Sequence, residues 1–446
     1  MIRTRQLVLV LLLGLFLRLG LSITVYSGDV NNHVEWGKGI LAAGASGAYD
    51  REYPGVMQPT YPPLSLFSFT TASWAYTSVY NLSWALNRTT QLFPSAVIWA
   101  LEDQDVLPAF FKLTSIFADL GIAVLIYALS RKVFSVSHEV GLIGAAVYLF
   151  NPAVFYNSAL WGQMESPPVF CVMLAVWLLL TKRPLWGHAA FVCSLLFKQS
   201  SLVFTPLFLL LSLFKSGWKK TGIGLLIQLL IFVLAYLPFL PVPGQELSPI
   251  NSQYSAVDPR FAALTYPFAV YLNRLEVGSG SNYISDHAFN LWAVFTRLEK
   301  IPDSTLIFAG LTADLFGKII FVSISGWFIA KYLLSRSSRD LISLFGLISF
   351  FSFMFLTRMH ERYLAPVLPF LGIVSLSKKQ LIPIYFLVSL GHLINLYHEW
   401  WFPYISWLVP VISDIRTVNV VIILFTVSLI SWSAVYFHAA NKTQSA

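Results

Sequence analysis

The chain has 446 residues, of which 57% are apolar and only 11% are charged, and its mean hydropathy is +0.68. A soluble globular protein carries roughly 25% charged residues, so this composition, with long apolar stretches along the whole chain, predicts a polytopic membrane protein. The net charge of +8 does not indicate nucleic-acid binding, because the Lys and Arg residues collect in short loops. We expect membrane lipids as partners and no nucleic acid.

The N-terminal part predicts one span followed by a long external loop. Arg3 and Arg5 place the N-terminus inside, so the apolar stretch Leu7–Tyr26 crosses outward. No small-residue cleavage site follows it, so we expect a span that stays rather than a removed signal peptide. Residues 27–107 then form the first external loop region, in which 31–43 has the pattern of a short amphipathic helix at the membrane surface.

Two apolar pieces inside this loop region have an open assignment. They are Leu64–Tyr80 and Leu92–Leu101, and they precede the span Phe110–Leu129, which ends in Arg131 and Lys132 on the inside. Both ends of the loop region are therefore external. By parity, the two pieces form either a membrane hairpin or interfacial helices.

The rest of the chain alternates between apolar segments and short basic loops. A second long external loop covers 242–303. We predict a single all-α membrane domain, 1–446, of about 12–14 transmembrane helices with both termini cytoplasmic. The further expected spans are Gly141–Asn157, 166–181, two short arms within 185–214 that break near Lys198–Ser201, 221–240, 305–333, 341–357, 363–377, 381–397 and 417–438.

The strongly polar motifs all fall at the outer ends of apolar segments, opposite to the loose Lys and Arg residues. Charge near a bilayer is costly, so charges gathered on one face of a membrane protein indicate a functional site. We therefore predict one active site at the outer membrane surface. The motifs are Gly28-Asp29, Trp161-Gly162-Gln163-Met164-Glu165, Lys198-Gln199 and Arg358-Met359-His360-Glu361-Arg362.

The acidic and amide residues of these motifs suit a reaction on a hydroxyl. Asp29 is a candidate general base, with the alternative that it only complements the N-terminus of the surface helix. Gln163 and Glu165 suit sugar hydroxyls, and Trp161 suits a sugar ring face. The alternative is an interfacial Trp with solvated polar neighbours.

The basic residues suit an anion. Lys198 interrupts an apolar stretch and needs an anion or carboxylate partner, unless its side chain snorkels to the outer surface. Arg358, His360 and Arg362 suit a phosphate, with an ion pair to Glu361 as the structural alternative.

The remaining polar residues and the cysteines give weaker signals. Cys171 and Cys193 lie in apolar segments and are expected to be packing residues. No metal-ligand spacing and no glycine-rich phosphate loop occurs, so we expect neither a metal nor a cofactor. The second external loop offers five candidates for substrate contact, namely Asp258, Arg260, Asn282, Asp286 and His287.

The order of five motifs resembles the GT-C membrane glycosyltransferases, over about residues 28–370. The likeness is greatest to the endoplasmic-reticulum glucosyltransferases that extend the N-glycan precursor and to prokaryotic relatives of the GPI-anchor mannosyltransferases. The motifs are Gly28-Asp29…His33…Trp36, Tyr61-Pro62-Pro63-Leu64, Asn151-Pro152…Trp161-Gly162-Gln163-x-Glu165, Phe197-Lys198-Gln199 and His360-Glu361-Arg362-Tyr363.

The resemblance implies a GT-C bundle whose long first external loop carries surface helices. It implies a donor sugar on a polyprenyl phosphate that enters from the bilayer. Asp29 matches the family's catalytic carboxylate, and Lys198 and the run Arg358–Arg362 match positions near the donor phosphate. The other motif residues, His33, Trp36, Tyr61 and Gln199 among them, are expected to contact substrate. Relatives often carry Asp where this chain has Glu165, which lengthens the arm by one methylene.

These expectations describe an inverting transferase that moves a hexose, mannose or glucose, from polyprenyl phosphate to a glycolipid or glycan acceptor at the external face. The membrane is the plasma membrane of a prokaryote or, alternatively, the endoplasmic reticulum. Three alternatives remain open. They are a transporter or flippase of a lipid-linked or small polar substrate, a lipid A or protein glycosyltransferase of the same fold, and a GT-C scaffold that only binds.

Overall fold

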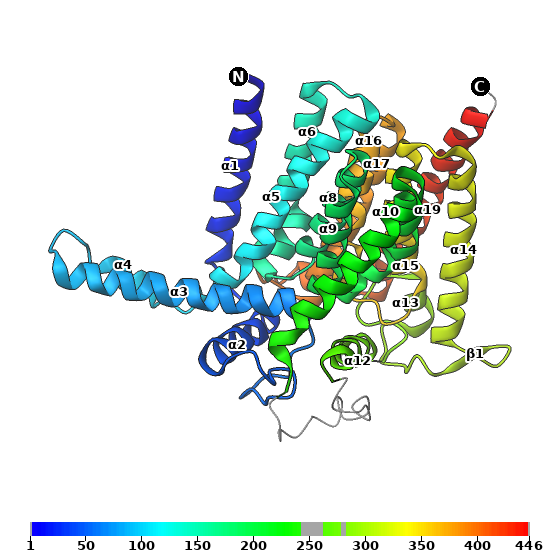
Figure 1. The fold of residues 1–446 in the computed structure, drawn as a ribbon. Coiled ribbons are helices and arrows are strands. Elements are labelled where there is room, and N and C mark those ends of the chain that lie inside the picture. Colours follow the sequence, from blue (N-terminus) through cyan, green and yellow to red (C-terminus); the bar gives the residue numbers. More distant parts are fainter. Residues whose placement is uncertain (1, 242–261, 278–281, 445–446) are drawn as a thin grey trace.

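The computed structural model describes residues 2–241, 262–277 and 282–444, and nearly all secondary structure in these ranges is helical. Strands β1 (Leu306–Phe308) and β2 (Leu311–Thr312) form a short antiparallel ribbon, the only sheet within the described ranges. Both labelled termini lie at one end of a helix bundle, and the β-ribbon lies at the opposite end (Figure 1). The candidates Asp258 and Arg260 lie outside the described residues.

The described residues contain seven helical stretches that are long and apolar enough to cross a membrane. An eighth appears if α6 (His138–Leu149) and the bent segment Pro152–Trp161 that follows it count as one span. This finding confirms the prediction of a multi-pass membrane protein. The seven contain α1 (Ile2–Ser22), α5 (Val106–Phe134), α10 (Thr205–Tyr236), α14 (Ala313–Ser335), α15 (Ser338–Phe355), α17 (Ile382–Glu399) and α19 (Ile415–Gln444).

The predicted number of about twelve spans also counted shorter and broken helices. Three of these are α8 (Ser166–Leu180), α9 (Pro184–Phe197) and α16 (Val367–Ser375), which stand within the bundle (Figure 1). The predicted break near residue 198 is present, because Lys198 is extended between α9 and the 3₁₀ turn η2 (Gln199–Phe204). α10 is broken again at Gly217, whose φ of 75° is left-handed. Seven or eight spans meet the length criterion, so the number twelve stays a prediction.

The first external loop region forms helices that run across the bundle rather than along it. α2 (Gly28–Ala43) follows α1, and α3 (Pro63–Thr89) extends sideways from the bundle beside the short α4 (Ala96–Leu101) (Figure 1). The Tyr76 hydroxyl donates to the Leu101 carbonyl over 2.8 Å and holds α4 against α3. A helix perpendicular to the spans favours interfacial helices over a membrane hairpin.

The remaining elements are one longer helix, α12, and several pieces of six residues or fewer. They are α7 (Pro152–Phe155), η1 (Tyr156–Trp161), η3 (Leu237–Phe239), α12 (Ala262–Val277), α13 (Leu291–Thr296), η5 (Glu361–Leu364), η6 (Lys379–Leu381) and α18 (Leu408–Ser413).

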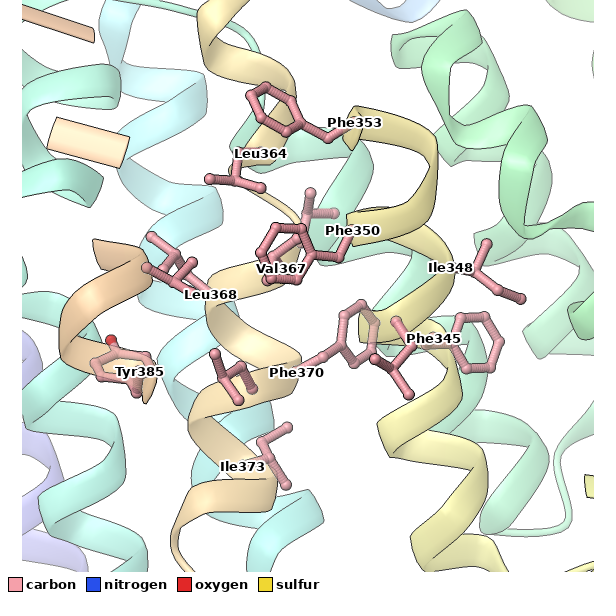
Figure 2. Packing of buried hydrophobic residues seen from close by; sticks show 14 of the residues in the cluster. Phe345, Ile348, Phe350, Phe353, Leu364, Val367, Leu368, Phe370, Ile373 and Tyr385 are labelled. Atoms are coloured by element: carbon pink, nitrogen blue, oxygen red, sulfur yellow. The ribbon is translucent and has the colours of Figure 1, made fainter. Parts of the chain in front are cut away.

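The centre of the bundle is a closely packed apolar layer. Phe345 and Phe350 of α15 pack among Leu368 and Phe370 of α16, and the Phe345 and Phe370 rings stack with centroids 5.6 Å apart (Figure 2). Lipid tails are as apolar as these side chains, so close packing rather than water exclusion holds membrane helices together. Gly346 permits this approach, because a Cβ there would collide with the Trp432 ring.

One ion pair is completely buried inside the bundle. Nε of Arg18 in α1 donates to Oδ2 of Asp119 in α5 over 2.9 Å, and neither side chain is exposed. Three hydroxyls complete the carboxylate's shell, because Ser158 and Ser166 each donate over 2.6 Å and Tyr148 donates over 3.2 Å. Asp119 therefore joins α1, α6, η1 and α8 to α5.

We predict that Asp119→Asn lowers the free energy of unfolding by about 3–5 kcal/mol, because it leaves the Arg18 guanidinium buried without an opposite charge. The unfolding midpoint in detergent, followed by intrinsic fluorescence, measures the loss. Adding Arg18→Met to this variant removes the uncompensated charge and restores most of the midpoint. A single variant that melts at the wild-type temperature would contradict the role of the pair.

Candidate functional site

A cavity of about 970 Å³ lies at the end of the bundle where α2 is found. It collects twelve of the thirteen residues predicted for the site, although they come from five separate parts of the chain. The twelve are Asp29, His33, Trp36, Tyr61, Trp161, Glu165, Lys198, Gln199, Arg358, His360, Glu361 and Arg362. The thirteenth, Gln163, is buried behind this wall and touches Asp29.

Asp29 lies in the first turn of α2 and is held by an amide. The Ser27 hydroxyl accepts a hydrogen bond from the Val30 N–H and caps the helix. Asp29 is the acidic residue of the first turn, where a negative charge complements the helix N-terminus. Nε2 of Gln163 donates to Oδ2 of Asp29 over 2.6 Å. The carboxylate is therefore oriented by a residue 134 positions along the chain.

The loop that carries Gln163 approaches α2 because of Gly162. The φ of Gly162 is 82°, and a Cβ there would collide with Val30 of α2. Ser27 donates to the Trp161 carbonyl over 3.0 Å, and Ser115 of α5 donates to the Gln163 carbonyl over 2.7 Å. These bonds fix the loop on both sides.

Opposing effects act on the pKa of Asp29. Burial raises it, but the positive charge of Arg362 and the hydrogen bond from Gln163 lower it by more, so the net pKa lies below the ordinary value. Asp29 is therefore ionised at neutral pH. An ionised carboxylate can accept a proton from a hydroxyl that is brought beside it.

Aromatic rings form the wall next to Asp29. The His33 ring stacks on Phe69 with centroids 4.2 Å apart and meets Tyr61 edge-on at 5.4 Å. Trp36 Nε1 donates to the Met57 carbonyl over 2.7 Å, which fixes its indole in the same wall. Burial lowers the pKa of His33 to about 3, so the imidazole is neutral at physiological pH.

Lys198 and Arg362 share the carboxylate of Glu165. Nζ of Lys198 forms an ion pair with Oε1 of Glu165, and Nε of Arg362 lies 3.5 Å from the same oxygen. Lys198 is only 5% exposed and lies 4.7 Å from the centre of the Tyr363 ring, so it does not snorkel. Burial lowers its pKa, although Glu165 offsets part of this effect.

The run Arg358–Arg362 separates into two environments. NH1 of Arg362 donates to Oε1 of Glu361 over 2.7 Å, and both side chains are buried or nearly so. Arg358 instead pairs with Asp303, and its side chain is 26% exposed. The two guanidiniums therefore do not form one clamp, and Arg362 is the one that stands beside Asp29 and Lys198.

Burial works against the charge of Arg362, but the carboxylates Glu361 and Asp29 outweigh it, so the pKa of Arg362 is raised. For Glu361, burial raises the pKa and Arg362 offsets part of the rise. Within the described part of the chain, two buried atoms of this group have no hydrogen-bond partner, namely Nε of Arg362 and Oε2 of Glu361.

Two predicted residues have neighbours that the sequence did not indicate. The Trp161 indole stacks on Trp400 with centroids 5.7 Å apart, so a protein ring already covers one of its faces. Gln199 donates to the Thr60 carbonyl over 3.3 Å and so connects its turn to the segment before α3.

Of the candidates in the second external loop, Asp286 and His287 line the cavity, whereas Asn282 is exposed and does not. Sequence analysis missed Glu399, which ends α17 and also lines the cavity. A signal for it existed, because Glu399 comes two residues after the apolar segment 381–397, which was expected to run outward. In the described ranges, no three His, Cys, Asp or Glu residues are grouped to hold a metal ion.

The cavity also reaches the apolar surface of the bundle. Phe321 and Val322 of α14 line it together with Val203 of η2 and Leu356, which follows α15. Val322 is 64% exposed, so this wall is also part of the surface that faces lipid in a membrane. A polar site therefore adjoins an apolar border.

Comparison of the chain with protein-family models finds no match, and comparison with curated proteins finds none either. The resemblance to the GT-C glycosyltransferases therefore rests on the order of the five motifs, and membership of that family stays a prediction.

We predict that His33 makes the fold sensitive to acid. Its folded pKa of about 3 lies below the ordinary 6.5, so stability is full above pH 6.5 and falls as the pH decreases toward 3. Between pH 7 and pH 4.5 this single group accounts for about 2–3 kcal/mol. His33→Phe keeps the stack on Phe69 and should flatten the dependence of the unfolding midpoint on pH in this interval. An equally steep dependence in the variant would refute the assignment.

Proposed function

We propose that the protein is an inverting glycosyltransferase that moves a hexose, mannose or glucose, from a polyprenyl-phosphate carrier to a glycolipid or glycan acceptor. The reaction takes place at the external face of a prokaryotic plasma membrane or, alternatively, in the endoplasmic reticulum. One observation carries the proposal. The ionised carboxylate of Asp29 shares a cavity with two buried cations, Lys198 and Arg362.

The chemistry of sugar transfer needs these groups. The acceptor hydroxyl gives its proton to Asp29 while its oxygen forms a bond to the anomeric carbon. The bond from that carbon to the phosphate oxygen breaks, and the phosphate leaves with its electron pair. Fixed cations stabilise this developing negative charge, a role that suits Lys198 and Arg362. Direct displacement uses no carboxylate nucleophile, so one base is sufficient.

Binding of the donor would strengthen the base. In the absence of donor, Arg362 lowers the pKa of Asp29. A phosphate between Arg362 and Lys198 neutralises part of that charge, so the pKa of Asp29 rises and its carboxylate holds a proton better. The phosphate would also share the two cations with Glu165, whose extra methylene relative to Asp lets the carboxylate reach Lys198.

The apolar border supports a lipid-linked donor. Phe321, Val322 and Val203 line the cavity where it meets the bundle surface. A polyprenyl chain can stay in the bilayer against such a wall while its phosphate reaches Lys198. A soluble nucleotide-sugar would need neither an apolar wall nor a membrane bundle.

The placement of charge disfavours a transporter. Transporters carry their ionisable residues near the middle of the membrane. Here the cavity lies at one end of the bundle, and the ion pair Arg18–Asp119 within the bundle is closed by hydrogen bonds and is not part of the cavity lining. The transferase reading explains the paired base and cations, which a carrier does not need.

We predict that Asp29→Asn lowers transfer by about 10²–10⁴-fold, because the amide cannot take the acceptor proton. The assay uses purified protein, radiolabelled polyprenyl-phosphate hexoses and native lipid extract. Glu35→Gln is a matched control, since it removes an acid from the same helix outside the cavity lining. Donor-induced shifts of the melting temperature should be at least as large in Asp29→Asn as in wild type, because a donor that raises the pKa of Asp29 binds no less well when this side chain is neutral. Substantial transfer by Asp29→Asn would rule out the base, and no transfer by wild type with any donor would favour the transporter.

We predict that Arg362→Gln raises the KM for the donor about 10–100-fold, because a charge-assisted hydrogen bond to phosphate is lost. Arg358→Gln should have a much smaller effect, since Arg358 pairs with Asp303 and is partly exposed. Steady-state kinetics with varied donor and saturating acceptor distinguish the two. A larger effect of Arg358→Gln would place the phosphate at the other end of the arginine run.

A further inference from the structure

A second group of ionisable side chains lines the same cavity. Nδ1 of His287 lies 2.7 Å from Oε2 of Glu399, and Nε2 of His287 lies 3.5 Å from Oδ1 of Asp286. The other oxygen of Asp286 is 3.5 Å from His360. A row of neighbouring acids and imidazoles therefore runs from Glu399 to His360, next to the pair formed by Glu361 and Arg362. The proposed reaction assigns no role to His287 or Glu399.

Two side chains of α17 hold His287 in place, one at its backbone carbonyl and one at its imidazole. Asn395 and Glu399 lie one turn apart on α17, and Nδ2 of Asn395 donates to the His287 carbonyl over 2.8 Å while Glu399 holds the side chain. The φ of His287 is 63°, in the left-handed region that is uncommon for residues other than glycine, although Asn, Asp and His adopt it more often than the rest. Such conformations persist where the surroundings determine them, and they cluster at functional sites.

The electrostatics of this end differ from those around Lys198. The hydrogen bond that His287 donates to Glu399 raises the pKa of His287, with burial acting against it, while burial and the charge of Arg362 hold the pKa of His360 well below its ordinary value. The group thus combines two carboxylates, Asp286 and Glu399, with at most one charged imidazole. Such a surface repels a phosphate and accepts hydrogen bonds from hydroxyl groups.

We propose that His287 and Glu399 form the acceptor subsite and bind hydroxyls of a neutral sugar. This inference rests on the proposed function. The donor phosphate belongs at the cations, so the acceptor sugar is left with the polar wall that carries the carboxylates. The side chains of His287 and Glu399 are 34% and 32% exposed, respectively, and both line the cavity, so a ligand can reach them. An acceptor sugar with its own carboxylate is disfavoured by like charge.

The test compares two variants that preserve local structure. Asn tolerates a left-handed φ, so His287→Asn keeps the backbone, and Glu399→Gln keeps the size of the side chain. Each should raise the KM for octyl mannoside or octyl glucoside about tenfold, while the donor KM stays within about twofold of wild type. Because the two residues act as a unit, the double variant should be little worse than either single one. Glu52→Gln, an exposed acid outside the cavity lining, should change neither KM.

A comparison of neutral and acidic acceptor sugars tests the expected effect of the Glu399 charge. Wild type should transfer to octyl glucoside at least tenfold better than to octyl glucuronide, and Glu399→Gln should reduce this preference. A rise in donor KM as large as that in acceptor KM, or no rise in either, would overturn the subsite while transfer itself stands. Transfer to native lipid but to neither neutral glycoside would overturn the neutral-sugar assignment. Absence of transfer from any donor would instead reject the proposed function, and the subsite with it.

Discussion

The polar face of α5 is the constraint on which the site depends. Lys112, Ser115 and Asp119 follow one another at helical spacing and are all completely buried. Lys112 donates to the Ser22 and Val25 carbonyls just before α2, Ser115 holds the loop of Gln163, and Asp119 anchors the two serines on either side of that loop. A buried charge without partners is too costly to keep, so these bonds allow very few arrangements of the segments that they join. Asp29 and Gln163 meet because α5 holds both of their segments.

The two buried cations of the cavity, Lys198 and Arg362, are paired with carboxylates of the protein. Lys198 and Arg362 share Glu165, and Arg362 also binds Glu361, so carboxylates of the protein compensate both positive charges. Burying two cations close together is otherwise unfavourable. The carboxylates that make the site stable also compete with a phosphate. On the proposed function, a donor would therefore need contacts from its sugar and lipid as well as its charge, which favours a lipid-linked sugar over a simple anion.

The sequence indicated where the polar motifs lie relative to the membrane, but it did not indicate which side chains pair with one another. It predicted a multi-pass protein and an outer-end cluster, because the cost of charge near a bilayer leaves few positions for Asp29, Lys198 and Arg362, and the structure brings those motifs to one cavity. It did not indicate that Arg358 pairs with Asp303 rather than with a ligand, since that choice depends on how two distant loops fold together. The sideways direction of α3 was equally open, because an apolar helix of that length suits either a span or an interface. Glu399 carried the same outer-end signal as the other acids and was simply overlooked.

The cavity is bordered by a hydrogen-bonded polar loop on one side and by apolar side chains of an outer helix on the other, and this asymmetry fits the proposed lipid-linked substrate. Toward α5, the loop of Gln163 is tied by buried hydrogen bonds, so the base keeps its orientation whatever enters. Toward α14, the wall consists of Phe321, Val322 and their neighbours, and α14 stands at the edge of the bundle (Figure 1). Apolar contacts have no preferred direction, so this side can part around a chain without leaving polar groups unpaired. In the proposed transferase, orienting the base and admitting a lipid chain from the membrane would require different kinds of wall, and the two walls come from different helices.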